Sequence, residues 1–186
     1  MSVKIENIIR RVLREQEEEK LSELPPFDDF FENDWNLVLN FMNRYPNKKF
    51  YYPGDLYLGE SDIETLGNLV KVEGKLDLYG NESFQSLGKL KHVGSWLNLL
   101  YCKNLKSLGD LEYVGGYLDL RETNIKSLVN LEYVGGWLDI GDSNVESLGN
   151  LEYVGGFLSL GYTPLSKKYT IEEIRNMVEV VGKVYL

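Results

Sequence analysis

The stretch LEYVGGYLDL, residues 111–120, is written almost unchanged twice more in this chain. It returns as LEYVGGWLDI at residues 131–140 and as LEYVGGFLSL at residues 151–160, so the copies begin 20 residues apart. A catalytic site is a single irregular place, whereas a motif restated at constant spacing indicates repeated architecture. We therefore interpret the stretch first as a unit of structure.

The same spacing extends through most of the chain. A pair of apolar residues separated by one position recurs every 20 or 21 residues, as Leu56/Leu58, Leu76/Leu78, Leu97/Leu99, Leu118/Leu120, Leu138/Ile140 and Leu158/Leu160. A valine column keeps the same phase, at Val72, Val93, Val114, Val134 and Val154. Self-similarity at this period is typical of a solenoid, in which each coil buries its apolar edge against its neighbours.

Each part of the repeat predicts a local structure. Two leucines separated by one residue point to the same side of an extended strand. Stacked coils would place these short strands in one parallel sheet, about 4.8 Å apart. A glycine before each strand predicts a corner with positive φ, which a residue without Cβ adopts easily. These glycines are Gly54, Gly74, Gly94, Gly115, Gly135 and Gly155.

The pattern L-x-x-L-x-x-V-G-G-x-L-x-L resembles a leucine-rich repeat of a short, irregular kind, over about residues 52–165. Its V-G-G-x-L-x-L corner is also similar to the β-helical L domains of growth-factor receptors. The resemblance implies an α/β solenoid, a right-handed coil in which an inward polar residue bonds the backbone of neighbouring coils. That position falls on Ser61, Asn81, Cys102, Thr123, Ser143 and Thr163. Leucine-rich repeats serve many unrelated functions, so the resemblance concerns the fold.

The repeat divides the chain into four parts. We expect an amphipathic helix with a charged leash at 1–24, a helical cap at 25–49, the solenoid at 50–165 and a helix-strand cap at 166–186. The first cap contains a helix predicted over residues 28–44, which Pro46 ends. In the second, Thr170 and Glu173 have the spacing of a capping box before a helix that reaches about residue 180. The last residues, KVYL, predict a closing strand.

The N-terminal segment carries a stripe of aliphatic residues, Ile5, Ile8, Ile9, Val12 and Leu13. Such a helix either folds onto its own body or docks on another protein. The sequence ENIIRRVLREQ is similar to N-terminal stretches of proteins from large tailed bacteriophages. That resemblance implies a virion-associated protein, trimmed after Leu-x-Glu at Glu15 or Glu23.

Composition narrows the classes of partner. The 186 residues include 20 Lys and Arg against 29 Asp and Glu, a formal net charge of −9. Nucleic-acid binding depends on basic groups that displace phosphate counterions, so we expect no nucleic-acid partner. The sequence contains no run of about 20 apolar residues, which is the length that would predict a membrane span. One cysteine and no secretory signal peptide favour the cytoplasm, or a particle assembled there.

The chemistry-bearing residues follow the repeat. The single histidine, His92, stands where other coils have Tyr113, Tyr133 and Tyr153, a column that predicts a tyrosine ladder. Cys102 occupies the inward polar position and is expected to be buried and inert. Repeated carboxylates are typical of a solvated face, and no phosphate-binding, zinc or nucleophile motif is present. We therefore predict no enzyme, no metal and no cofactor.

One outward surface is a candidate for binding. Side-chain alternation places Trp96, Tyr117, Trp137 and Phe157 in one outward column and Asp119 and Asp139 in the next, with Arg121 beside them. These rings could stabilise the sheet by stacking, or lie under the N-terminal helix. They could also bind a protein, because Trp and Tyr often anchor interfaces, or stack on a carbohydrate.

The prediction is therefore a non-enzymatic protein-binding scaffold. The alternatives are a structural or head-associated bacteriophage virion protein and a carbohydrate-binding module.

Overall fold

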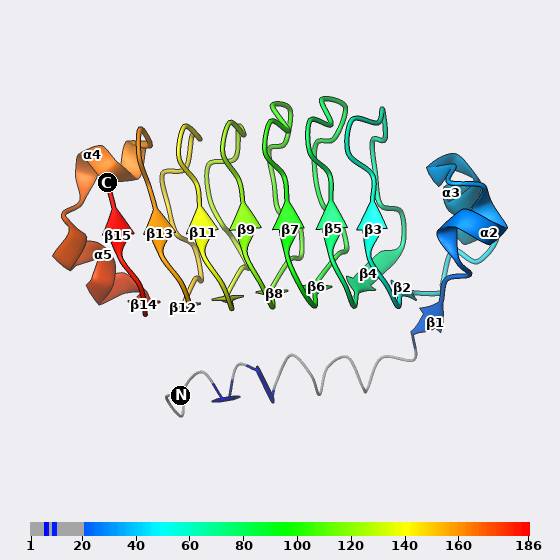
Figure 1. The fold of residues 1–186 in the computed structure, drawn as a ribbon, viewed down its shortest axis with the longest axis horizontal. Coiled ribbons are helices and arrows are strands. Elements are labelled where there is room, and N and C mark those ends of the chain that lie inside the picture. Colours follow the sequence, from blue (N-terminus) through cyan, green and yellow to red (C-terminus); the bar gives the residue numbers. More distant parts are fainter. Residues whose placement is uncertain (1–5, 8, 11–20) are drawn as a thin grey trace.

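A computed structural model describes residues 6–7, 9–10 and 21–186 of the chain. These residues form a parallel β-solenoid of about five turns with a spacing near 21 residues (Figure 1). The predicted repeat is thus confirmed at the level of the fold. The strands make two parallel sheets, however, and not the single sheet that the sequence predicted.

The first sheet, here sheet B, contains the predicted Leu-x-Leu strands. They are β3 (Leu56–Tyr57), β5 (Leu76–Asp77), β7 (Leu97–Asn98), β9 (Leu118–Asp119), β11 (Leu138–Asp139), β13 (Leu158–Ser159) and β15 (Val184–Tyr185). Equivalent residues of successive coils pair directly, as Leu97 does with Leu118 and Leu118 with Leu138. The predicted closing strand is β15, which pairs with β13.

The second sheet, sheet A, contains β1 (Ser22–Glu23), β2 (Phe50–Tyr52), β4 (Leu69–Val72), β6 (His92–Val93), β8 (Tyr113–Val114), β10 (Tyr133–Val134), β12 (Tyr153–Val154) and β14 (Glu179–Val180). It adjoins the first sheet at the glycine corner, because only residues 115–117 separate β8 from β9. The valine column was predicted as core but not as strand. In β6, β8, β10 and β12 the buried valine has no apolar residue two positions away, so no alternation of period two is visible in the sequence.

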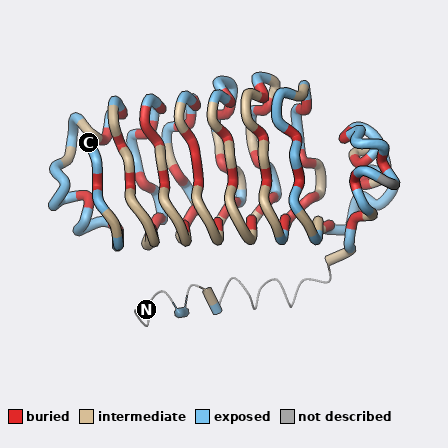
Figure 2. Tube along the Cα trace, in the orientation of Figure 1, coloured by how far each residue is buried: buried red, intermediate tan, exposed pale blue. Residues whose placement is uncertain are grey.

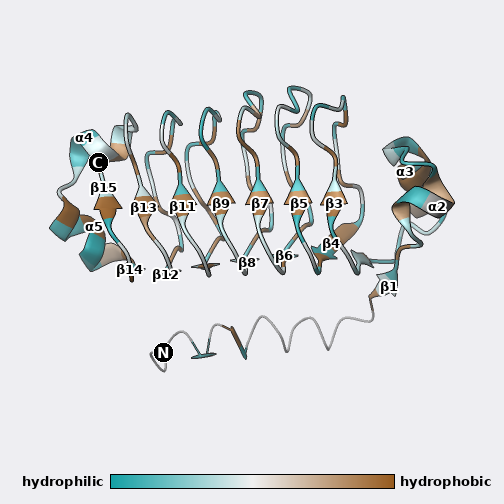
Figure 3. Cartoon of the chain, in the orientation of Figure 1, coloured by the Kyte–Doolittle hydropathy of each residue, from teal (hydrophilic) through white to brown (hydrophobic). Residues whose placement is uncertain are grey.

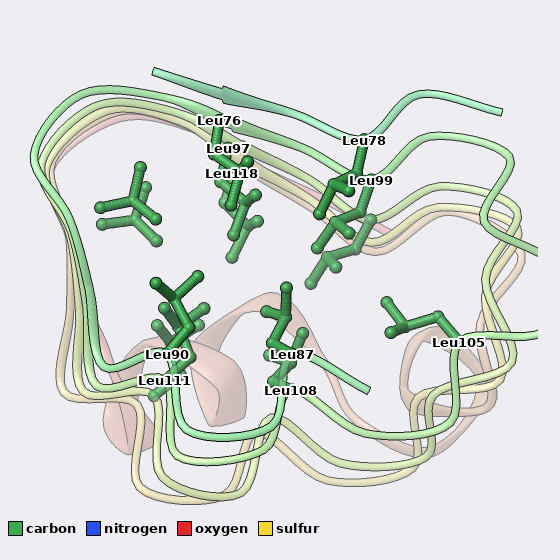
Figure 4. Packing of buried hydrophobic residues seen from close by; sticks show 14 of the residues in the cluster. Leu76, Leu78, Leu87, Leu90, Leu97, Leu99, Leu105, Leu108, Leu111 and Leu118 are labelled. Carbon is green, nitrogen blue, oxygen red and sulfur yellow. The ribbon is translucent and has the colours of Figure 1, made fainter. Parts of the chain in front are cut away.

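Leucine and valine columns from both sheets fill the interior of the coil. Figure 4 shows Leu76, Leu97 and Leu118 stacked on one wall, with Leu90 and Leu111 opposite. All five are fully buried. Buried and hydrophobic segments recur at the same place in each coil (Figures 2 and 3). One continuous core therefore runs along the solenoid axis, as the repeat predicted.

The corner glycines are required for a different reason from the one predicted. Gly115, Gly135 and Gly155 do not have positive φ. A Cβ at Gly135 would instead lie 2.1 Å from the carbonyl oxygen of Gly115 in the preceding coil. The left-handed positions form two other columns, of which one contains Gly67, Gly88, Gly109, Val129 and Gly149. Close approach of successive coils, and not backbone conformation, excludes larger side chains at these corners.

The inward polar position also differs from the expected pattern. The hydroxyls of Thr123 and Ser143 donate to the carbonyl three residues earlier in their own coil, at 2.7 and 2.5 Å. Cys102 does reach the preceding coil, because its Sγ lies 3.0 Å from the carbonyl oxygen of Leu78. Asn81 also reaches the preceding coil, since its Nδ2 lies 3.4 Å from Ser61 Oγ. The inward column therefore joins coils near its N-terminal end, whereas Thr123, Ser143 and Thr163 close their own turns.

Within residues 21–186, helices are few and short. They are α2 (Phe27–Phe31), α3 (Trp35–Asn43), α4 (Pro164–Lys168) and α5 (Ile171–Met177), near the two ends of the solenoid (Figure 1). None lies within the described coils from 50 to 163, so the α/β part of the expected fold class is not seen there. Among the described helices, none is long and apolar enough to cross a membrane.

The predicted helix over 28–44 is two helices, because Glu32 and Asn33 have positive φ and break it. Phe31 of α2 and Trp35 of α3 are buried in the same core cluster as the coils. The predicted capping box is present at the start of α5, where Thr170 and Glu173 bond each other's backbone N–H. That helix ends at Met177, earlier than expected, because the chain then enters β14.

Candidate binding surface

Four aromatic rings lie in register on the outward face of sheet B, each directly before a strand. Ring centroids are 5.3 Å apart for Trp96 and Tyr117, 4.3 Å for Tyr117 and Trp137, and 5.4 Å for Trp137 and Phe157. The planes of successive rings differ by 7° or less. The predicted column is therefore a face-to-face stack across four coils, here called the aromatic stack.

Other residues cover the two ends of the aromatic stack. Lys75 Nζ lies 5.8 Å from the ring centroid of Trp96, and the ring of Tyr57 meets Trp96 at a steep angle. At the other end, Tyr185 packs edge-to-face on Phe157 with centroids 5.9 Å apart. The ring faces are thus in contact within the protein, and the half-buried rings present mainly their edges outward.

The acidic and amide column beside the stack has a structural role that the sequence did not predict. Asp77, Asn98, Asp119 and Asp139 each accept a hydrogen bond from the backbone N–H two residues later, at 2.9 to 3.1 Å. These Asx turns end the strands of sheet B. The recurrence of Asp or Asn at one position in four coils was the available signal.

Arg121 closes over this column. Its Nη2 lies 2.6 Å from Asp119 Oδ2, and its Nε lies 3.0 Å from Asp119 Oδ1. The same Nε lies 3.7 Å from Asp139 Oδ2. The hydrogen bonds to Asp119 raise the pKa of Arg121. Asp119 itself is only 4% exposed. Of the three polar residues predicted to bind a partner, Arg121 is the accessible one and Asp119 is committed to internal contacts.

A second stack lies on the outward face of sheet A. Ring centroids are 4.5 Å apart for His92 and Tyr113, 4.8 Å for Tyr113 and Tyr133, and 5.0 Å for Tyr133 and Tyr153. The predicted tyrosine ladder is confirmed, with His92 at its end. Burial, followed by the nearby charge of Lys71, lowers the pKa of His92 to about 4. Its Nδ1 is buried and has no hydrogen-bond partner among the described residues.

The predicted N-terminal docking residues are mostly outside the described part of the chain. Ile5, Ile8, Val12 and Leu13 belong to this group. Ile9 is described, and it is half-buried in a short helical segment in which Arg10 pairs with Glu6. The role of this stripe stays a prediction.

The described residues offer little reactive chemistry. Burial raises the pKa of the Cys102 thiol to about 12, so the thiolate that reacts or binds metal is disfavoured. Among residues 6–7, 9–10 and 21–186, no three His, Cys, Asp or Glu side chains gather as a metal site. The surface of sheet B is therefore the best-developed candidate site. Comparison with models of protein families, with curated proteins and with solved structures gave no match.

Proposed function

We propose that this chain is a non-enzymatic binding scaffold whose partner is another protein, and that the partner contacts the aromatic stack on sheet B. The observation that carries the proposal is a rigid apolar ridge of four parallel rings on four successive coils. Rings that are already held by stacking lose little conformational freedom when a partner binds. Trp and Tyr are also the residues that most often anchor protein interfaces.

The outward edge of the ridge supports the same proposal. The indole N–H groups of Trp96 and Trp137 and the hydroxyl of Tyr117 have no hydrogen-bond partner among the described residues. Three polar groups on neighbouring coils can therefore bond a partner's backbone or side chains. Arg121 lies beside them with its side chain 42% exposed, although its guanidinium is paired with Asp119.

The arrangement of the rings favours a protein over a carbohydrate. A sugar that binds by stacking needs the face of an aromatic ring. The faces of Tyr117 and Trp137 are covered by their neighbours, and Tyr57, Lys75 and Tyr185 lie at the two ends of the stack. A protein partner can instead use the ring edges and the polar groups on them.

The virion alternative rests on residues 1–24, most of which are outside the described part of the chain. It remains a proposal with a direct test. Mass analysis of the N-terminus in purified particles would show cleavage after Glu15 or Glu23 if it holds. An intact chain that is absent from particles would remove it.

The proposed surface is tested with the double variant Trp96→Ser/Trp137→Ser. We expect capture of the partner from a host extract to be lost while the circular-dichroism spectrum stays native-like. Tyr133→Ser is the matched control, because it removes a ring stacked on both faces in the other sheet. Equal loss of capture in the control, or unfolding of the double variant, would show that the rings serve stability and not binding.

A further inference from the structure

The two sheets differ at their edges. Beside β2, strand β1 covers the edge of sheet A, where Ser22 and Leu24 donate N–H groups to the carbonyls of Lys49 and Tyr51 at 2.9 Å. At its far end, Arg175 bonds the open carbonyls of Val180 and Gly182, at 2.8 and 2.6 Å. Sheet B begins with β3, and no described strand lies beyond it. One strand position at the N-terminal end is thus filled in sheet A and empty in sheet B.

The backbone of β3 is available on that open side. The N–H groups of Leu56 and Leu58 donate to the carbonyls of Lys75 and Asp77 in the second coil, at 2.8 and 2.7 Å. Because backbone groups of consecutive strand residues face opposite sides, the N–H and C=O of Tyr57 point away from the second coil. No described residue pairs with them. An unpaired edge of this kind is a template for another strand.

A slot adjoins this edge. It has a volume of about 350 Å³ and lies between the helical segment, which contributes Phe27, Asn33 and Trp35, and the first coil, which contributes Tyr57 and Gly59. A second hollow of about 190 Å³ shares Phe27, Asn33 and Tyr57 with it. The combined size falls in the range of about 300–1,000 Å³ that is usual for ligand pockets.

The lining of the slot is acidic. Asp34 and Asp62 line the larger hollow, and Asp28 and Asp55 line the smaller one. Neither lining contains a lysine or an arginine, although Lys75 pairs with Asp55 from outside it, with Nζ 3.3 Å from Oδ2. Asp62 is exposed, and none of the described residues pairs with its carboxylate. A ligand with positive side chains is therefore favoured over a neutral or acidic one.

We propose that the slot binds an extended basic segment of a partner protein, which adds as a strand beside β3. Its backbone bonds the N–H and C=O of Tyr57, and its Lys or Arg side chains lie against Asp34 and Asp62. Main-chain bonds supply affinity in this mode of recognition, and alternate side chains supply specificity. The proposal stands independently of the aromatic stack, although the ring of Tyr57 packs against Trp96 at one end of it.

The probe for this site is the peptide acetyl-Lys-Val-Lys-Val-Lys-amide, added to the full-length chain. We expect saturable binding by calorimetry and at least tenfold slower hydrogen exchange at the Tyr57 amide. Two matched peptides should bind at least tenfold more weakly. One replaces every Lys by Glu and tests charge, and the other carries N-methyl groups at alternate residues and tests the backbone bonds.

Variants of the chain locate the site. Asn36→Trp fills the slot from an exposed position on α3 and should abolish binding, whereas Asn40→Trp on the same helix should not. Asp62→Lys should weaken binding at least tenfold, and Asp110→Lys, an exposed aspartate outside the slot lining, should leave it unchanged. Trp137→Ser should bind the peptide normally, which separates this proposal from the one for the aromatic stack.

Several results would overturn the proposal. Absence of saturable binding, equal binding of the Glu peptide, or normal binding to Asn36→Trp would each do so. Protection of the Tyr57 amide in the free chain that rises with protein concentration would identify a second copy as the occupant. Protection that is independent of concentration would identify a segment of the same chain.

Discussion

At the scale of single residues, Val129 differs from the glycines found at the equivalent position of the other coils. The equivalent positions are the glycines at 67, 88, 109 and 149, and all five residues have positive φ, with Val129 at 45°. A β-branched side chain is strained in this region, at a cost of about 1–3 kcal/mol. The side chain is 41% exposed, so it gains little from burial in return.

We therefore expect Val129→Gly to be more stable than the natural sequence, by about 1 kcal/mol. The relief of strain is offset in part by the larger conformational entropy of glycine in the unfolded chain. Thermal melting of the two proteins measures the difference. A lower melting temperature for Val129→Gly would show that the valine side chain contributes packing that outweighs its strain.

His92 is the second residue that departs from its column, in which other coils have tyrosine. Its effect on the stability of the protein depends on pH. Its folded pKa of about 4 lies below the unfolded value of 6.5. Between these values the unfolded chain binds a proton that the folded chain does not, so stability falls as pH drops from about 6.5 to about 4. The loss from this group reaches about 3 kcal/mol and ends below the folded pKa.

His92→Tyr should remove this loss, because it restores the residue found at 113, 133 and 153. The difference in unfolding free energy between the two proteins should widen in favour of Tyr as pH falls from 7 to 4. Denaturant titrations at several pH values measure it. Parallel curves for the two proteins would show that His92 is protonated to the same extent in the folded and the unfolded chain.

At the scale of the element, the backbones of successive coils are in close contact at the corners. The corner at Gly135 lies so close to Gly115 that a Cβ would be 2.1 Å from its carbonyl oxygen. Short strands paired in register on both sides of the corner hold the two coils at this separation. Neither coil can move away alone, so the contact is inflexible.

We expect Gly135→Ala to destabilise the protein by about 1–3 kcal/mol, and Gly135→Val by more, because the added atoms overpack the corner. Gly161→Ala is the control, since a Cβ there meets nothing within 4 Å. Chemical denaturation of the three variants tests this. Gly135→Asn separates the two explanations, because a positive-φ corner would tolerate Asn and a steric contact does not.

At the scale of the whole molecule, a solenoid is a row of coils that contact only their neighbours, so its ends open first. The C-terminal end is closed by Arg175, which bonds the carbonyls of Val180 and Gly182. The guanidinium satisfies backbone groups that would otherwise be free on the last coil. The same helix, α5, also contributes the buried side chain of Ile174.

Arg175→Ala should therefore loosen one end and leave the middle unchanged. We expect faster hydrogen exchange in β14 and β15, unchanged exchange in β7 and β9, and a loss of stability of about 1 kcal/mol. Lys167→Ala, an exposed lysine of α4, is the control. Uniformly faster exchange along all coils would show that the solenoid opens as one unit.

The coil, its period and its core followed from the sequence, because side chains that recur at 20 or 21 residues can be buried together only if the chain stacks on itself. The stacked rings of Trp96, Tyr117, Trp137 and Phe157 followed in the same way. The capping box at Thr170 was visible because its hydrogen bonds are local.

Tertiary structure alone decided the features that depend on distances between coils. The central strands of the second sheet carry one valine each and no alternating apolar pair. The reason for Gly135 is a contact with another coil, and Asp119 is buried because Arg121 closes over it. The open edge of β3 likewise exists only because β1 joins the other sheet. The period of the sequence shows which residues are stacked, but it does not fix how closely two coils approach or which sheet a terminal strand joins. Only the folded chain therefore decided the open edge and the slot beside β3.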